Sequence, residues 1–297
     1  MIAITGATGF IGKFVVSNLK EKKIPFFCIA REKSDISHIK QLGIEIKIAD
    51  ITHYDSLKGS LRGANSVIHM AALSKSNDIK ELEKVNIEGT KNIVKACEAL
   101  GIKRIIFTSS DNAREGKGLY GLSKRKAEDA VKKSTLNWTI LRITDIYGEY
   151  NKKNLGFIKN LIKKSFFVPV VGWNCILQPV YVKDAVNAII SVLNSKKTNK
   201  KMYYIAGKNR VKLSKYIQIL SKAIKKKIIR IYVPIYLIFF PVWIQEKILR
   251  NPFITVSELN YLSNDHLFDI GDNMRDFNYN PVDLKEGIRE MIRHEKS

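Results

Sequence analysis

A tyrosine and a lysine stand four residues apart in a polar, helix-forming stretch of this 297-residue chain. Side chains four apart share one face of a helix, so Tyr120 and Lys124 are predicted to lie together. A nearby ammonium favours the phenolate and lowers the tyrosine pKa, which suits Tyr120 to move a proton on a hydroxyl or ketone. Ser110 follows an apolar run and can hydrogen-bond the reacting oxygen. These three residues form the predicted catalytic group.

Three glycines, Gly6, Gly9 and Gly12, follow the first apolar run of the chain. The first turn of a helix offers unpaired N–H groups and a positive dipole end, where a pyrophosphate can bind if no side chain blocks it. Gly6 permits a tight turn, Gly9 a close approach of the ligand, and Gly12 close packing of helix on strand. The spacing predicts a dinucleotide site, and a glycine-rich turn without a ligand is the alternative.

Strand and helix patterns alternate through the first half of the chain. Strands are predicted over 2–5, 26–30, 44–48, 66–69, 104–108 and 138–143, with helices over 11–22, 37–42, 56–62, 85–100 and 119–133. This alternation predicts βαβ units and a parallel sheet covered on both faces. The pattern loosens after about residue 151, where a smaller, discontinuous lobe is expected.

The composition restricts which binding partners and which cellular compartment are expected. The chain carries 51 Lys+Arg against 28 Asp+Glu, a net charge of +23. Most lysine runs are expected on solvated faces, with an anionic partner or an acidic membrane surface as the alternative. Nucleic acid is not expected, because no zinc-finger spacing or RNA-binding aromatic signature occurs. Three cysteines without a CxxC pair and the absence of a basic leader predict a cytoplasmic protein.

The motifs after the glycine turn carry a family resemblance. They lie at 69–72, 86–90, 108–110, 120–124, 142–148, 178–185 and 279–288. In this order they cover nearly the whole chain, which resembles the extended short-chain dehydrogenase/reductase family of NAD(P)-dependent epimerases and dehydratases. The short separation of Ser110 and Tyr120 resembles the branch of the respiratory complex I accessory subunit and its bacterial relatives, often labelled nucleoside-diphosphate-sugar epimerases.

The resemblance implies an α/β fold, a Rossmann-type doubly wound parallel sheet with a smaller C-terminal substrate lobe. The NAD(P)-binding Rossmann domain is expected over 1–150. The substrate-binding lobe is expected mainly over 151–297, and about 176–205 is expected to return to the Rossmann sheet. A homodimer stays open as the oligomeric state.

The implied function is NAD(P)-dependent oxidoreduction or epimerisation of a nucleotide sugar by hydride transfer, assisted by the predicted catalytic group. The 4,6-dehydratases of the family carry an acid and a base after the catalytic serine. This chain has Asp111 and Asn112 there, so 4,6-dehydration is disfavoured. A ketone or hydroxysteroid-type reductase using NADPH, and a non-catalytic cofactor-binding assembly or redox-sensing protein, are the alternatives.

The resemblance also implies the binding residues. The cofactor is expected to contact Gly6, Gly9, Phe10, Ile11, Gly12, Arg31, Lys33, Asp50, Ile51, Ala71, Ala72, Asn86, Thr108, Tyr120, Lys124 and Ile143. Substrate contacts are expected at Ser74, Ser110, Asp111 and Asp145. No metal site is expected, because His69 lacks an acidic or histidine cluster and fits a hydrogen-bonded loop histidine.

The end of the second strand bears on the choice of cofactor. NAD enzymes usually carry an acidic residue there for the ribose 2′-hydroxyl, whereas Arg31 and Lys33 could hold a 2′-phosphate. Glu32 is the counter-argument, and a solvated loop arginine is the alternative for Arg31. We expect NAD(P), with NADP(H) favoured over NAD(H).

The apolar stretch 231–244 is shorter than the roughly 20 residues needed to cross a bilayer, and two prolines interrupt it. We expect a buried helix of the lobe. Contact with a membrane surface is the alternative and is not favoured.

Overall fold

The computed structural model describes residues 1–74, 76, 78–116, 118–151, 155–249 and 254–295. The chain divides into two compact units. The first comprises Met1–Ile143, Val186–Ile205 and Gly271–Tyr279, and the second comprises Thr144–Ala185, Ala206–Ile270 and Asn280–Ser297. The first unit therefore ends at residue 143 where 150 was predicted, and it regains the chain at residue 186 and again at 271. Which unit binds cofactor and which binds substrate stays a prediction.

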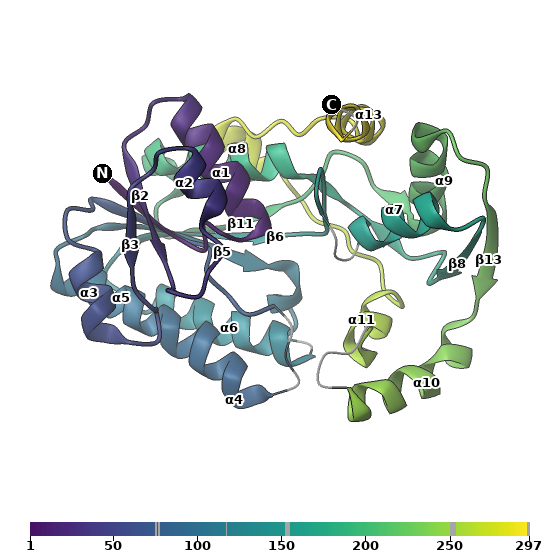
Figure 1. Cartoon of the computed structure of the whole chain (residues 1–297), viewed down its shortest axis with the longest axis horizontal. Helices are drawn as coiled ribbons and strands as arrows, with labels where there is room; N and C mark the ends of the chain where they lie inside the picture. The colour runs from purple at the N-terminus through teal and green to yellow at the C-terminus, as the bar shows by residue number, and fades with distance from the viewer. Residues whose placement is uncertain (75, 77, 117, 152–154, 250–253, 296–297) are drawn as a thin grey trace. The chain divides into compact units, whose positions relative to one another are not determined.

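A parallel sheet of seven strands forms the centre of the first unit, in the order β11-β6-β5-β4-β1-β2-β3 (Figure 1). The strands are β1 (Ile2–Thr5), β2 (Phe26–Ala30), β3 (Ile46–Ile48), β4 (Ser66–His69), β5 (Arg104–Ser110), β6 (Asn137–Ile143) and β11 (Lys201–Ile205). This is the predicted Rossmann-type doubly wound sheet. The strand order reverses between β1 and β4, the place where such sheets bind ligands at the carboxyl ends of their strands.

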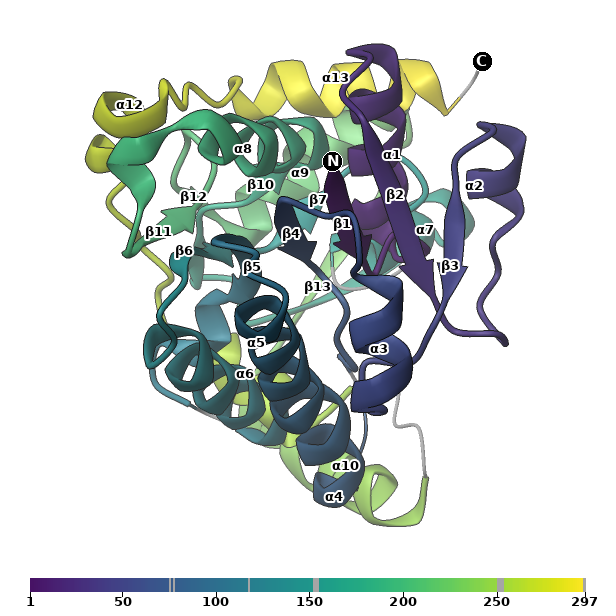
Figure 2. The ribbon, with the colours of Figure 1, turned by 90° about the vertical axis from the view of Figure 1, so that its left-hand side faces the viewer.

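Helices cover both faces of this sheet, α1 and α8 on one and α3, α5 and α6 on the other (Figures 1 and 2). The helices of this part are α1 (Phe10–Glu21), α2 (Ser37–Gln41), α3 (Tyr54–Ser60), α4 (Ile79–Leu82), α5 (Gly89–Ala99), α6 (Gly118–Lys132), α8 (Val182–Asn194) and α12 (Gly271–Phe277). All four residues of β1 are buried, as expected of a strand covered on both faces.

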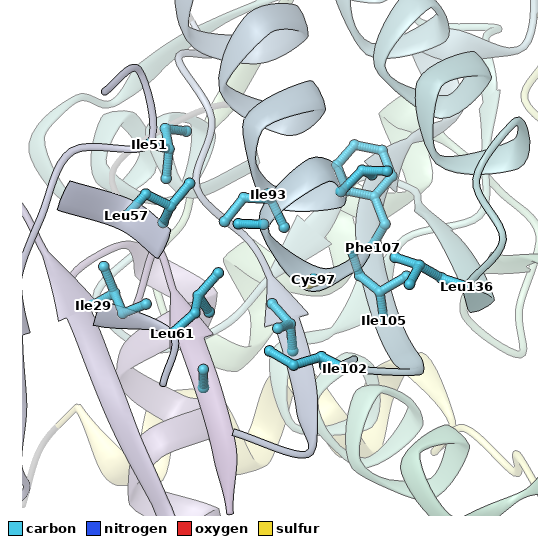
Figure 3. Close-up of a cluster of buried hydrophobic side chains, with 14 of the residues drawn as sticks. Ile29, Ile51, Leu57, Leu61, Ile93, Cys97, Ile102, Ile105, Phe107 and Leu136 are labelled. Carbon is cyan, nitrogen blue, oxygen red and sulfur yellow. The ribbon is translucent and has the colours of Figure 1, made fainter. Parts of the chain in front are cut away.

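A hydrophobic core lies between the sheet and the helices α3, α5 and α6 (Figure 3). Ile29 and Phe107 reach it from strands, and Leu57 and Ile93 reach it from helices. Cys97 of α5 belongs to the same core and is a free, buried thiol. The core therefore fixes the helices that carry the candidate site.

The helix predicted over 85–100 is divided in the structure. It begins with α4, continues as the π-helical turn η1 (Glu83–Glu88), and ends with α5. Single π-helical turns within α-helices are frequent at functional sites. This turn carries Asn86, one of the predicted cofactor residues.

The second unit contains three strand pairs with helices around them. The pairs are β7 (Ile146–Tyr147) with β10 (Val180–Tyr181), β8 (Phe167–Val171) with β13 (Ile229–Val233), and β9 (Ile176–Leu177) with β12 (Val211–Lys212). Its helices are α7 (Leu155–Lys164), α9 (Leu213–Ile224), α10 (Ile235–Ile248), α11 (Val256–Tyr261) and α13 (Leu284–His294). Three buried tyrosines pack at its centre, with the Tyr147 ring 5.4 Å from Tyr181 and 6.4 Å from Tyr216.

The predicted buried helix at 231–244 is wrong in two respects. Residues up to Val233 belong to β13, and in α10 only Val242 is buried. The apolar composition predicted burial, but α10 packs against α11 and leaves much of its circumference in water. Among the helices that the structure describes, none combines the length and apolar character needed to cross a bilayer.

Candidate functional site

The turn after β1 can be built only with glycine at two of its three positions. Gly6 has a φ of +77°, and a Cβ there would lie 2.5 Å from the backbone nitrogen of Ala71. A Cβ at Gly12 would collide with the carbonyl oxygen of Gly6. These glycines bring the chain close to the segment after β4 and seat α1 against the turn.

The third glycine has a different place in the turn. Gly9 is exposed, precedes α1 as its N-cap, and provides no side-chain cap for the first N–H groups. Phe10 and Ile11 open the helix and are half-buried. Uncapped N–H groups at an open glycine cradle suit a pyrophosphate, so this turn fits the dinucleotide that the sequence predicts.

Substitution of Gly9 separates ligand binding from folding. A Cβ at Gly9 meets only the carbonyl oxygen of Gly6, at 3.2 Å, and the φ of −75° is ordinary for any residue. Gly9→Val is therefore expected to fold and to weaken NAD(P) binding at least about tenfold, because its branched side chain occupies the phosphate position. Calorimetric titration of the folded variant measures this. Gly59→Val is the matched control, since nothing lies within 4 Å of a Cβ there. Unchanged affinity in Gly9→Val contradicts the assignment.

Further predicted cofactor residues gather at the carboxyl edge of the sheet, because parallel strands all end there. Arg31 and Lys33 follow β2 and are exposed. Asp50 follows β3, and its Oδ1 accepts hydrogen bonds of 2.9 Å from the backbone nitrogen and the hydroxyl of Thr52. Ala71, with Ala72 and Ser74, follows β4.

Three of the predicted contact residues are either buried or belong to the second unit. Ile51 contributes its side chain to the hydrophobic core and packs against Gly89, so it offers a ligand only backbone atoms. Ile143 is buried at the end of β6. Asp145 belongs to the second unit, where it accepts a 2.9 Å hydrogen bond from the Tyr261 hydroxyl.

His69 is the last residue of β4, which corrects the expected loop position. It is fully buried, and its ring nitrogens lie 2.7 Å from the Thr5 hydroxyl and 3.1 Å from the Thr90 hydroxyl. Burial lowers the pKa of His69 to about 3, and the Lys124 ammonium adds to the shift. The imidazole is therefore a neutral, hydrogen-bonded group that ties β1 and α5 to β4.

Asn86 holds the segment after β4 in place. Its side-chain oxygen accepts from the Leu73 nitrogen at 2.7 Å, and its amide donates to the Leu73 carbonyl and to the Ser123 hydroxyl, both at 2.9 Å. Both amide hydrogens are thereby used within the protein. Asn86 is a positioning residue that connects the Ala71–Leu73 segment to α6.

Tyr120 and Lys124 lie one turn apart on α6, as predicted. The Lys124 ammonium is buried, donates to the Thr108 carbonyl at 2.8 Å and lies 4.1 Å from the centre of the Phe107 ring. Burial lowers the pKa of Lys124 to about 7, against the opposing effect of the Glu128 carboxylate. The lysine is thus anchored near the end of β5, at the residue two positions before Ser110.

The predicted lowering of the Tyr120 pKa is wrong for the cofactor-free chain. Burial, with a smaller contribution from the Asp111 carboxylate, raises the pKa of the phenol to about 12. The spacing of Tyr120 and Lys124 shows neither this burial nor this carboxylate. In this state the phenol is a proton donor.

Ser110 and Asp111 form a short turn at the end of β5. The Ser110 hydroxyl donates to Asp111 Oδ1 at 3.1 Å and accepts from the Asn112 nitrogen at 3.3 Å. This turn packs on α6 at Gly121, where a Cβ would lie 2.6 Å from the Asn112 carbonyl oxygen. Gly121, which the sequence analysis did not identify, therefore lets the Ser110 turn and the Tyr120 helix approach each other.

A buried ion pair joins α6 to β6. Glu128, one turn after Lys124, accepts two hydrogen bonds from Arg142, at 2.8 and 2.7 Å, and one of 2.6 Å from Ser109. Arg142 also donates to the Tyr204 hydroxyl at 2.8 Å. This network was not predicted, although the sequence carries two signals of it: a charge inside an apolar strand, and a carboxylate that continues the Tyr120–Lys124 face.

A cavity of about 350 Å³ lies elsewhere, within the second unit between α9 and α13. Its lining includes the basic residues Lys215, Lys222, Lys285 and Arg289, and none of the predicted site residues. We assign the candidate site to the sheet edge, because the glycine turn after β1 and the Lys124 anchor on β5 both lie there.

Comparison with known proteins agrees with this geometry. Residues 2–206 match the NAD dependent epimerase/dehydratase family. The chain is 30% identical over 192 residues to ceramide reductase of Caulobacter vibrioides, an alignment covering 64% of this chain and 60% of that protein. It is 27% identical over 268 residues to UDP-glucose 4-epimerase of Vibrio cholerae, covering 79% of each.

Two other similarities extend over nearly the whole chain. Subunit 9 of the NADH dehydrogenase 1 alpha subcomplex of Dictyostelium discoideum is 23% identical over 303 residues, covering 98% of this chain and 83% of that one. The fold resembles a crystal structure of UDP-glucose 4-epimerase from Thermotoga maritima, with a TM-score of 0.80 and 18% identity over 99% of this chain and 98% of that one. By sequence and fold, this chain belongs to the NAD dependent epimerase/dehydratase family.

Proposed function

We propose that the protein is an NAD(P)-dependent oxidoreductase that epimerises a nucleotide sugar, with Ser110, Tyr120 and Lys124 as its catalytic residues. The observation that carries the proposal is that two features lie at one edge of the same sheet. The glycine turn opens α1 there without a side-chain cap, and Lys124 is anchored at the end of β5. The similarity to UDP-glucose 4-epimerase supports a nucleotide sugar as substrate.

Each residue has a defined task in this proposal. The bound nicotinamide supplies the hydride acceptor and donor. Tyr120 moves the proton at the substrate oxygen, and Ser110 hydrogen-bonds that oxygen. Lys124 supplies a positive charge next to the phenol whenever it is protonated, which favours the phenolate needed for oxidation. Asn112 lacks an acidic or basic group, so 4,6-dehydration stays disfavoured.

A reductase acting on a ketone is the second candidate, and one observation favours it. The Tyr120 phenol is protonated in the cofactor-free chain and can give a proton to a carbonyl oxygen, although its pKa, raised to about 12, makes it a weaker acid than an ordinary tyrosine. A proton donor beside a hydride donor is what ketone reduction requires. The relative named ceramide reductase supports this direction.

A non-catalytic cofactor-binding protein is the third candidate. The NADH dehydrogenase subunit aligns with nearly the whole of this chain, which supports a part in an assembly or in redox sensing. The retained Ser110, Tyr120 and Lys124 argue against it.

A substrate panel distinguishes the three. Purified protein is incubated with NAD(P)⁺ or NAD(P)H and with UDP-, dTDP- and GDP-sugars or simple ketones, and both nicotinamide absorbance and epimer formation are followed. Interconversion of epimers without net cofactor change supports the epimerase. Net oxidation of NAD(P)H by a ketone supports the reductase. Absence of turnover across the panel contradicts both enzymatic proposals.

We propose NADP(H) as the preferred cofactor, resting on Arg31 and Lys33. A charged hydrogen bond to the 2′-phosphate contributes about 1.5–3 kcal/mol, so Arg31→Ala is expected to weaken NADP(H) binding about tenfold or more and leave NAD(H) unaffected. Titration of both cofactors measures this, with Arg62→Ala as the control at another exposed arginine. Equal or tighter binding of NAD(H) by the unaltered protein contradicts the preference.

A further inference from the structure

The helix α10 exposes aromatic side chains that its composition would place away from water. Tyr236, Phe240 and Trp243 are 75%, 64% and 46% exposed. Positions i, i+4 and i+7 share one face of a helix, so these rings form a stripe. Val242 lies on another side and is buried, where α10 packs against α11. Because α10 is apolar on every side before its last turn, its exposed stripe fits an apolar environment that the described residues do not supply.

The strand pair before α10 continues this apolar character. In the register of β8 and β13, Phe167 lies opposite Ile229 and Pro169 lies opposite Ile231. All four residues are exposed, so they form a ladder on one face of the pair. We call this ladder, together with the stripe of Tyr236, Phe240 and Trp243, the α10 surface. It belongs entirely to the second unit.

Lysines border the α10 surface. Lys163 and Lys164 end α7 just before β8, and 225–227 precede β13. Because β8 and β13 are parallel and paired, both runs lie at the same end of the pair, and Lys226 Nζ donates to the Lys163 carbonyl at 2.7 Å. Lys247 is exposed in the last turn of α10, at the other end of the surface. Along the chain, exposed apolar residues of β8, β13 and α10 thus lie between lysines at the start of the strand pair and a lysine at the end of the helix.

We infer that the α10 surface docks on the headgroup region of a bilayer that contains anionic lipid, with the aromatic stripe inserted and the lysines on lipid phosphates. Tyrosine and tryptophan are the side chains enriched at membrane interfaces, and each lysine near an anionic surface adds to the attraction. The 14 residues of α10 extend about 21 Å, less than the ~30 Å hydrocarbon core, so the helix lies along the surface.

Charge decides between a lipid surface and a second copy of the chain. A symmetric dimer through the α10 surface would place the same patch of both copies together, and with it both sets of lysines. Like charges so placed repel each other. An anionic bilayer satisfies the apolar stripe and the lysines at once, which is why we choose it as the occupant.

Vesicle sedimentation tests the apolar part. The full-length protein is mixed with vesicles of equimolar phosphatidylglycerol and phosphatidylcholine, and bound protein is measured after centrifugation. Phe240→Asp is expected to lower the partition coefficient about tenfold or more, because it puts a charge in place of an exposed ring that would insert into the bilayer. Met274→Asp, at a methionine of α12 that is 55% exposed, is the matched control and is expected to leave binding unchanged.

A second pair of variants tests the lysines at equal net charge. Reversal of Lys225 and Lys227 to glutamate is expected to weaken binding about tenfold or more. The same reversal of Lys196 and Lys197, exposed lysines of the first unit, is expected to change binding by less than about a third of that fold-change. Circular dichroism confirms that all four variants fold.

Several results would overturn the inference. It is contradicted if the unaltered protein fails to sediment with the anionic vesicles, or if Phe240→Asp binds like the unaltered protein. It is also contradicted if both lysine reversals weaken binding equally. A dimer that dissociates in Phe240→Asp, without vesicle binding by the unaltered protein, assigns the α10 surface to a second copy instead.

Discussion

Replacement of Tyr120 by phenylalanine is expected to lower turnover by about 10²–10⁴, because the variant loses the proton carrier and keeps the ring. NAD(P) affinity is expected to hold, since the variant keeps the ring and every other expected cofactor contact. Turnover is measured on whichever substrate the panel identifies, and affinity is measured by calorimetry. Tyr54→Phe is the matched control, because Tyr54 lies on α3 and is not a predicted site residue. The Lys95 ammonium lies 4.5 Å from the centre of its ring.

Two results would contradict this account of Tyr120. Full turnover in Tyr120→Phe would mean that another group moves the proton. If no substrate turns over and Tyr120→Phe restores growth of a deletion strain as well as the unaltered gene does, the assembly or sensor candidate replaces the enzymatic ones.

Removal of Glu128 is expected to destabilise the fold by about 3–5 kcal/mol, because it leaves the Arg142 guanidinium buried without its carboxylate. Glu128 is fully buried and accepts from Arg142 and Ser109, so its loss affects α6, β5 and β6 together. The free energy of unfolding of Glu128→Leu in urea measures the cost. Glu88→Leu is the control, since its 2.8 Å pair with Lys91 is exposed and its loss is expected to cost less than about 1 kcal/mol.

A double variant separates the charge from the packing. Glu128→Leu combined with Arg142→Met replaces the whole pair by apolar side chains, and it is expected to regain most of the lost stability. If the double variant is as unstable as the single changes added together, the cost lies in packing, and the uncompensated guanidinium is not its cause.

The parts of the site that depend on local backbone geometry could be predicted from the sequence. Gly6 and Gly12 were predictable because a positive φ and a close approach of backbone leave no alternative residue. The alternation of apolar strands and helices likewise predicted the parallel sheet, since strands covered on both faces are apolar throughout. In both cases, the physical constraint acts within a few neighbouring residues.

The parts that depend on distant neighbours could not be predicted. The π-helical turn at Asn86 bonds to Leu73 and Ser123, which are 13 and 37 residues away. The Tyr120 pKa depends on burial and on Asp111, which spacing along one helix does not show. The exposure of Phe240 also depends on distant neighbours. The composition indicates an apolar helix, but only the packing of the second unit determines which of its side chains are covered.

Native mass spectrometry of the freshly purified full-length protein, before and after incubation with NAD(H) and NADP(H), tests the central claim most directly. The unaltered chain is expected to carry one dinucleotide, and Gly9→Val is expected to lack it. A chain that stays free of dinucleotide under every condition, while its fold is intact, would contradict cofactor binding at the glycine turn and the proposed chemistry with it.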